Sequence, residues 1–110
     1  MTTGTVSRVC FLMHLKPERV EEYLTAHETV WPDMLDALTA CGWRNYSLFV
    51  NKQDGLVVGY LETDDFDRAR AEMDRTDVNA RWQATMAGFF TEDTAPDTTM
   101  LQLHEYFHLA

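Results

Sequence analysis

The sequence has few basic residues and no long apolar run, which argues against two kinds of partner. Lysine and arginine number 9 against 18 acidic residues, so the net charge is −9. A chain of this charge repels polyphosphates and anionic lipid headgroups, and we expect it to bind neither nucleic acid nor membranes. No window holds the roughly 18 apolar residues that a membrane span needs, and Met1 to Val6 lacks the features of a signal peptide. We therefore expect a cytoplasmic protein.

Cysteine and glycine are also scarce, with 2 and 5 residues. Cys10 lies in an apolar segment and Cys41 precedes a glycine, which suits neither a disulfide framework nor a metal site and fits a reducing compartment. The glycines form no loop between a strand and a helix that could hold a phosphate. The 4 histidines, which are His14, His27, His104 and His108, lack the spacing of a zinc site. The sequence therefore predicts no metal and no cofactor.

Apolar material, by contrast, is sufficient for one domain. Of the 110 residues, 45% are hydrophobic and 12% are aromatic. A chain of this length can bury a core without disulfides or a metal, and nothing in it resembles a linker between two hydrophobic segments. We expect a single domain over residues 1–110.

The pattern of apolar residues predicts four strands, at residues 6–15, 44–51, 56–63 and 100–109. The first is apolar throughout, which suits a strand covered on both faces. The second and third flank the turn Lys52-Gln53-Asp54-Gly55 and form a β-hairpin. The fourth alternates between apolar and polar residues and follows a polar loop, 92–99, that contains Pro96.

Two helical regions lie between these strands. The first runs to about residue 40, where Cys41-Gly42 closes it, and its internal Pro32 lacks a backbone donor, so we expect a kink or restart near Trp31. The second begins after the possible N-caps Asp64 and Asp65 and is interrupted near Thr76-Asp77. The order βαββαβ is that of an α+β, ferredoxin-like domain, with an antiparallel four-stranded sheet covered by helices on one face. The other face needs a cover or a ligand.

Three ring-bearing side chains of the first helical region have a spacing that predicts a common helix face. Tyr23, His27 and Trp31 follow at i, i+4 and i+8, so a phenol, an imidazole and an indole share one helix face. Imidazole both gives and takes a proton near neutral pH, and a phenol beside it donates and accepts hydrogen bonds. The same spacing also fits an aromatic stripe in the core with a satisfied histidine.

Tyr46 and Trp82 add two more rings, each with an apolar face and one polar atom. Carbohydrate sites combine such rings with directed hydrogen bonds, because sugar C–H faces pack on aromatic faces. A buried tyrosine or tryptophan of the core would have the same one-dimensional pattern, so both interpretations stay open for each residue.

Taken together, these residues resemble the L-rhamnose mutarotase family. The ordered segments that carry the resemblance are Phe11 to Pro17, Glu22-Tyr23 with His27, Val30-Trp31-Pro32, Asn45-Tyr46-Ser47, Arg81-Trp82 with Met86, and Phe107-His108-Leu109. They run from about Arg8 to the C-terminus, which is nearly the whole chain. The set is specific in its order and spacing, although single pieces such as Trp-Pro are not.

The resemblance implies a dimeric α/β barrel, a homodimer in which each subunit holds one pyranose between sheet and helices. It implies that His27 is the proton donor, and that Tyr23, Tyr46 and a tryptophan pair contact the sugar. This chain has Trp82-Gln83 in place of the pair, and Ala95 to Met100 departs from the family's loop. Gln83 replaces a stacking surface with a hydrogen-bonding amide, and we include it among the sugar-binding residues.

The expected activity is interconversion of the α and β anomers of L-rhamnose or a related 6-deoxy sugar by general acid–base catalysis. His27 would deliver and recover the proton, while Tyr23 positions or relays it. Two alternatives stay open on the same fold. One is a cofactor-free oxygenase or polyketide cyclase, and the other is a non-catalytic sugar-binding protein.

Overall fold

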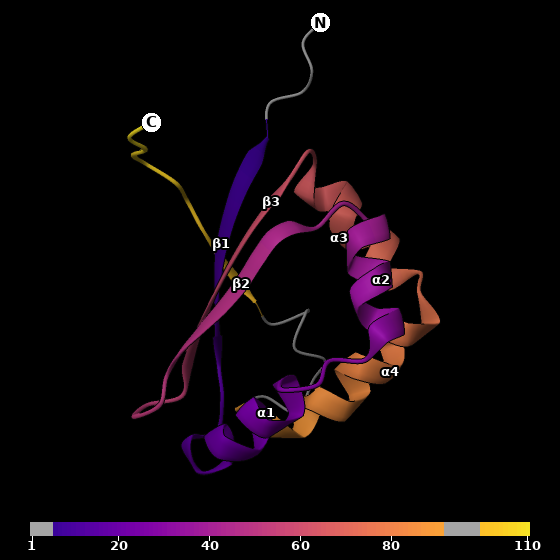
Figure 1. Ribbon diagram of the computed structural model, residues 1–110. Helices are drawn as coiled ribbons and strands as arrows, with labels where there is room; N and C mark the ends of the chain where they lie inside the picture. Colours follow the sequence, from indigo (N-terminus) through magenta and orange to yellow (C-terminus); the bar gives the residue numbers. More distant parts are fainter. Residues whose placement is uncertain (1–5, 92–99) are drawn as a thin grey trace, which may run out of the picture.

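The protein consists of a β-sheet with helices packed along one of its faces (Figure 1). The computed structural model describes residues 6–91 and 100–110. In these ranges the strands are β1 (Ser7–His14), β2 (Arg44–Asn51), β3 (Leu56–Thr63) and β4 (Leu101–Leu103). They lie in the order β2-β3-β1-β4, and every neighbouring pair is antiparallel. The predicted α+β, ferredoxin-like fold is confirmed, and the strands of the hairpin have the predicted bounds.

Each predicted helical region is divided into two α-helices and one short 3₁₀ segment. The first comprises the short 3₁₀ segment η1 (Pro17–Arg19), α1 (Val20–His27) and α2 (Pro32–Ala40). The second comprises α3 (Phe66–Asp74), α4 (Asp77–Met86) and the 3₁₀ segment η2 (Ala87–Phe89). The restart falls where proline predicts it, because Pro32 occupies the first turn of α2, where a missing N–H costs nothing. Asp65 and Thr76 cap α3 and α4, accepting hydrogen bonds from the backbone N of Arg68 at 3.1 Å and of Asn79 at 3.2 Å.

The core lies between the helices and one face of the sheet. Alternate residues of β1 and β3 are buried there, and Phe11, Leu15, Val57 and Leu61 have the most deeply buried large side chains. The residues between them on β1 are only half-buried, so the expectation that this strand is covered on both faces is wrong for the single chain. The pattern was misleading because the outward residues, such as Leu12, are apolar too.

The last strand is shorter than predicted. β4 covers Leu101–Leu103 and pairs with Cys10 to Leu12 of β1, whereas 104–110 forms no strand and is exposed. One link to the sheet is the ion pair between Arg8 and Glu105, at 2.9 Å. Alternation alone predicted strand as far as 109, but a strand continues only where a neighbour supplies backbone partners. The predicted loop 92–99 lies outside the described residues.

Gly42 and Gly55 lie in the two turns predicted from the sequence. Gly42 closes α2 with φ of 86°, and Gly55 turns the hairpin with φ of 80°, a region that side chains disfavour. At Gly55 a Cβ atom would also lie 2.5 Å from the backbone oxygen of Leu15. The hairpin tip therefore packs directly against the end of β1, and Leu15 N donates to the Gly55 oxygen at 2.8 Å.

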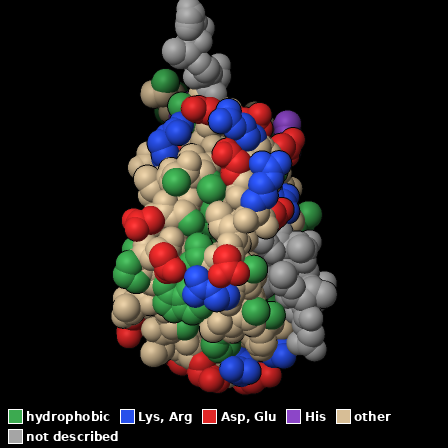
Figure 2. All heavy atoms as spheres, turned by 90° about the vertical axis from the view of Figure 1, so that its right-hand side faces the viewer, with side chains coloured by type: hydrophobic (Ala, Val, Ile, Leu, Met, Phe, Trp, Pro, Cys, Tyr) green, Lys and Arg blue, Asp and Glu red, His purple; other side chains and the backbone are tan. Residues whose placement is uncertain are grey.

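Acidic and basic side chains are interspersed over the helical face (Figure 2). In the described parts of the chain, no helix has both the length and the apolar character to span a bilayer.

Candidate active site

Two adjoining cavities lie between the helices and the inner face of the sheet. The larger has a volume of about 360 Å³ and the smaller about 50 Å³. The residues that line both are His27, Tyr46, Leu48, Trp82, Gln83 and Met100. Tyr23 lines the smaller cavity, so the structure brings all five sequence-predicted site residues to one place. A cavity of a few hundred cubic ångströms suits a small metabolite.

His27 is the last residue of α1, one turn after Tyr23, and the two rings pack with centroids 4.3 Å apart. Its Nδ1 lies 3.1 Å from the backbone oxygen of Tyr23. A carbonyl oxygen only accepts hydrogen bonds, so Nδ1 carries the hydrogen and donates it. In the neutral imidazole, Nε2 is then the unprotonated nitrogen, which can take a proton from a ligand.

Burial determines the charge state of both residues. The pKa of His27 is lowered from its usual 6.5, because desolvation outweighs the hydrogen bond to the Tyr23 carbonyl that favours the charged form. Burial raises the pKa of Tyr23 to about 12. At neutral pH the cavity therefore contains a neutral imidazole, able to act as a base, and a protonated phenol, able to donate a hydrogen bond.

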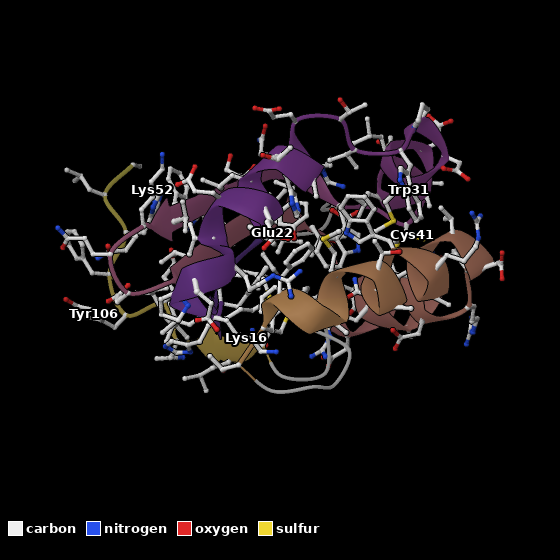
Figure 3. The ribbon with its side chains drawn as sticks, turned by 90° about the horizontal axis from the view of Figure 1, so that it is seen from below. Lys16, Glu22, Trp31, Cys41, Lys52 and Tyr106 are labelled. Atoms are coloured by element: carbon white, nitrogen blue, oxygen red, sulfur yellow. The ribbon has the colours of Figure 1, made fainter. Side chains whose placement is uncertain are left out.

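Trp82 lies in the middle of the aromatic cluster. Its ring packs edge to face against His27 at 5.3 Å and against Trp31 at 5.0 Å. The expectation that Trp31 continues the helix face of Tyr23 and His27 is wrong, because α1 ends at His27 and Trp31 caps α2. Trp31 joins the cluster through Trp82, inside the helical layer, whereas Tyr106 lies far off beside the sheet (Figure 3).

Tyr46 reaches the cavity from β2, directly after an irregularity in the strand. The register with β3 shifts between Arg44 and Ser47, and Asn45 has a positive φ of 47°. Asn45 also donates from Nδ2 to Glu62 at 2.8 Å, which ties this bulge to β3. Asparagine tolerates the left-handed region better than most residues, so the sequence supports the bulge locally. Burial raises the pKa of Tyr46 and keeps its phenol protonated.

Gln83 follows Trp82 on α4 and belongs to a pair of amides. Its Nε2 donates to Oδ1 of Asn79 at 3.1 Å, one helical turn earlier, and Asn79 lines the larger cavity. We did not predict Asn79 as a site residue, although its i, i+4 spacing from Gln83 was visible in the sequence. Trp43 and Met34 also line the larger cavity and were missed, because nothing local distinguishes them from core residues.

The other histidines lie away from this site. His14 ends β1, and His104 and His108 belong to the C-terminal segment; all three are exposed. Within residues 6–91 and 100–110, no three His, Cys, Asp or Glu side chains gather as a metal site would require. The polar side chains that line the two cavities include an imidazole, phenols and amides, together with Arg70 and Asp74 at the larger one, and such groups can move protons and bind hydroxyl groups.

The two sequence comparisons give the same family. The family model described as L-rhamnose mutarotase matches residues 8–109. An L-rhamnose mutarotase of Bacillus subtilis is 32% identical over 104 residues, which cover 94% of this chain and 99% of that protein.

Solved structures share the fold. The crystal structure of an L-rhamnose mutarotase from Formosa agariphila has a TM-score of 0.79 at 20% identity, covering 94% of this chain and 99% of the other. A dimeric ferredoxin-like protein from an uncultured marine organism has a TM-score of 0.56 at 13% identity, covering 98% and 95%.

Proposed function

This chain belongs to the L-rhamnose mutarotase family, and we propose that it interconverts the α and β anomers of L-rhamnose through His27 and Tyr23. The observation that carries the assignment of residues is the hydrogen bond from His27 Nδ1 to the Tyr23 backbone oxygen, at 3.1 Å. It leaves Nε2 as the proton acceptor of an imidazole that lines both cavities.

Mutarotation needs a base and an acid at neighbouring atoms of one sugar. The anomeric hydroxyl loses its proton, the bond between C1 and the ring oxygen breaks, and the ring oxygen gains a proton. The open-chain aldehyde rotates about C1–C2, and the reverse transfers close the ring on the other face. No proton is consumed overall, so one residue that both takes and returns a proton is sufficient in principle.

His27 performs these transfers in our proposal. Nε2 takes the proton of the anomeric hydroxyl, and the imidazolium that forms delivers a proton to the ring oxygen, which is bonded to the same carbon. Tyr23, protonated because burial raises its pKa to about 12, donates a hydrogen bond to the reacting oxygens and relays the proton. Tyr46 and Trp82 hold the pyranose between rings that pack on its C–H faces, and Gln83 offers an amide to its hydroxyls.

Saturation-transfer NMR of L-rhamnose measures anomer exchange directly. We expect wild type to exceed the uncatalysed rate, and His27→Ala to lose a factor of about 10² to 10⁴. Tyr23→Phe tests the relay, and His14→Ala is the matched control because His14 is an exposed histidine outside the cavity. If His27→Ala exchanged the anomers as fast as wild type does, His27 would not be the catalytic residue. No acceleration by wild type, with thermal stabilisation by polycyclic phenols, would favour an oxygenase or cyclase instead.

We also propose that the protein is a homodimer that joins the uncovered faces of two sheets. On that face the register places an apolar patch of Cys10, Leu12, Phe49, Val58, Leu101 and Leu103, next to polar residues that include Arg8, Ser47, Tyr60 and Glu62. Phe49 and Leu101 are each 59% exposed. Helices cover only the opposite face (Figure 1). An exposed apolar patch with polar neighbours is typical of a protein interface.

The dimer is tested by sedimentation at micromolar concentration. Phe49→Glu places a charge on the proposed interface and is expected to give monomers, because a buried, unpaired charge costs several kcal/mol. Ala71→Glu adds the same charge on the exposed side of α3 and should stay dimeric. A wild-type monomer contradicts the proposal.

Both cysteines are free, which fits the reducing cytoplasm that we propose as the compartment.

A further inference from the structure

One buried polar atom in the cavity wall has no partner. Among the side chains of the described residues, Gln83 Oε1 is the buried oxygen or nitrogen that makes no hydrogen bond. Buried polar groups are almost always hydrogen-bonded, and an unsatisfied one in a folded protein needs an explanation. Gln83 lines both cavities, so a ligand in them lies beside this side chain.

The amide nitrogen of Gln83 holds the side chain in place. Nε2 donates to Asn79 Oδ1 at 3.1 Å. Asn79 is itself only 5% exposed, and its backbone N donates to the capping oxygen of Thr76 at 3.2 Å. Rotating the Gln83 amide by itself would place Oε1 against Asn79 Oδ1, a second acceptor, and break this hydrogen bond. The acceptor is therefore preorganised, and a partner has to come to it.

A carbonyl oxygen accepts hydrogen bonds and donates none. Its partner in the ligand must be a donor, which in a sugar is a hydroxyl group. The ring oxygen, a methyl group or a methyl ether cannot serve. His27 and Trp82 line the same two cavities as Gln83, so a sugar with its anomeric carbon at His27 has its remaining hydroxyls within the same enclosure.

We propose that Gln83 is a specificity-determining residue whose Oε1 accepts a hydrogen bond from one non-anomeric hydroxyl of the sugar, and that Asn79 is the positioning residue that fixes this amide. The inference rests on the mutarotase activity proposed above and adds the selection of substrates by a single hydroxyl. A sugar without that hydroxyl leaves the buried acceptor unpaired, and sites built in this way reject such analogues strongly.

The test pairs deoxy sugars with variants of Gln83. The rate of anomer exchange per enzyme, relative to the uncatalysed rate, is measured for L-rhamnose and its 2-, 3- and 4-deoxy analogues. In wild type, one analogue is expected to lose about 10- to 100-fold in kcat/KM beyond the others. Gln83→Met keeps the length of the side chain but lacks the amide oxygen, and should reduce that discrimination to within about 3-fold.

Two further variants separate positioning from folding. Asn79→Asp retains the oxygen that receives the Gln83 N–H and should also discriminate, whereas Asn79→Leu should lose discrimination while the protein stays folded by circular dichroism. A merely structural Asn79 would lower the rate for all four sugars by the same factor.

The outcomes distinguish this inference from the function on which it rests. Wild type that accelerates exchange, with the same discrimination in Gln83→Met, overturns the inference and leaves the mutarotase intact. Equal rates for all four sugars in wild type do the same. Wild type that accelerates exchange of none of the sugars overturns both.

Discussion

Gly59 of β3 gives a sharp test of how the core supports the cavity. It lies opposite Phe11 of β1, and the ring of Phe11 lies across the glycine where a side chain would otherwise be. Phe11 is fully buried, and its ring centroid is 6.3 Å from that of Tyr46. Gly59→Ala is therefore expected to destabilise the fold and to move a residue next to the site.

The magnitude follows from the distances. A Cβ atom on Gly59 would lie 2.2 Å from Cζ of Phe11, whereas ordinary contact begins at 3.4 Å. The ring must therefore move by about 1.2 Å within a packed core. Overpacking of this kind costs about 1–3 kcal/mol. In a domain of this size each kcal/mol lowers Tm by roughly 4 °C, so we expect a decrease of about 4–12 °C.

Thermal and urea unfolding of four proteins check this reasoning: wild type, Gly59→Ala, Phe11→Leu and the double variant. The smaller Leu makes room for the added methyl, so the double variant should be more stable than the sum of the single effects by about 1 kcal/mol. Gly88→Ala is the control, because a Cβ there meets nothing within 4 Å, and should change stability by less than about 0.5 kcal/mol. Gly59→Ala at wild-type stability, or strictly additive effects, would refute the argument.

Three other outcomes follow from caps and pKa shifts. Thr76→Ala removes the cap of α4 and should cost about 0.5–2 kcal/mol in urea unfolding, with Thr76→Ser close to wild type. Burial lowers the pKa of His27 below 6.5, and the proposed mechanism uses the neutral imidazole as the base. Exchange activity should therefore fall with decreasing pH at a midpoint below 6.5, and a midpoint above 6.5 would contradict the mechanism. In the unfolded chain the imidazole of His27 has its ordinary pKa and binds a proton more readily than in the folded protein. The free energy of unfolding should therefore decrease as pH falls below 6.5. His27→Gln should flatten this pH dependence between pH 7 and 5.

Local sequence determined where several helices and turns begin and end, and it placed one pair of cavity residues in contact. Pro32 separates α1 from α2, Gly55 turns the hairpin and Asp65 caps α3, because each acts through its own backbone or its near neighbours. The i, i+4 spacing of Tyr23 and His27 likewise places their rings in contact on one helix. Properties that depend on a few bonds along the chain could be predicted without the fold.

Tertiary packing decided the rest of the site. Trp82 lies between His27 and Trp31, although spacing alone placed Trp31 on the helix of His27. The length of β4 depended on the partner strand, because alternation does not reveal where pairing stops. Burial of the Gln83 oxygen and the lowered pKa of His27 both require surfaces from distant parts of the chain to exclude water. The sequence by itself therefore predicted five candidate residues that the fold brings to the cavities, and only the packed structure decided their environment, since desolvation depends on everything that surrounds a group.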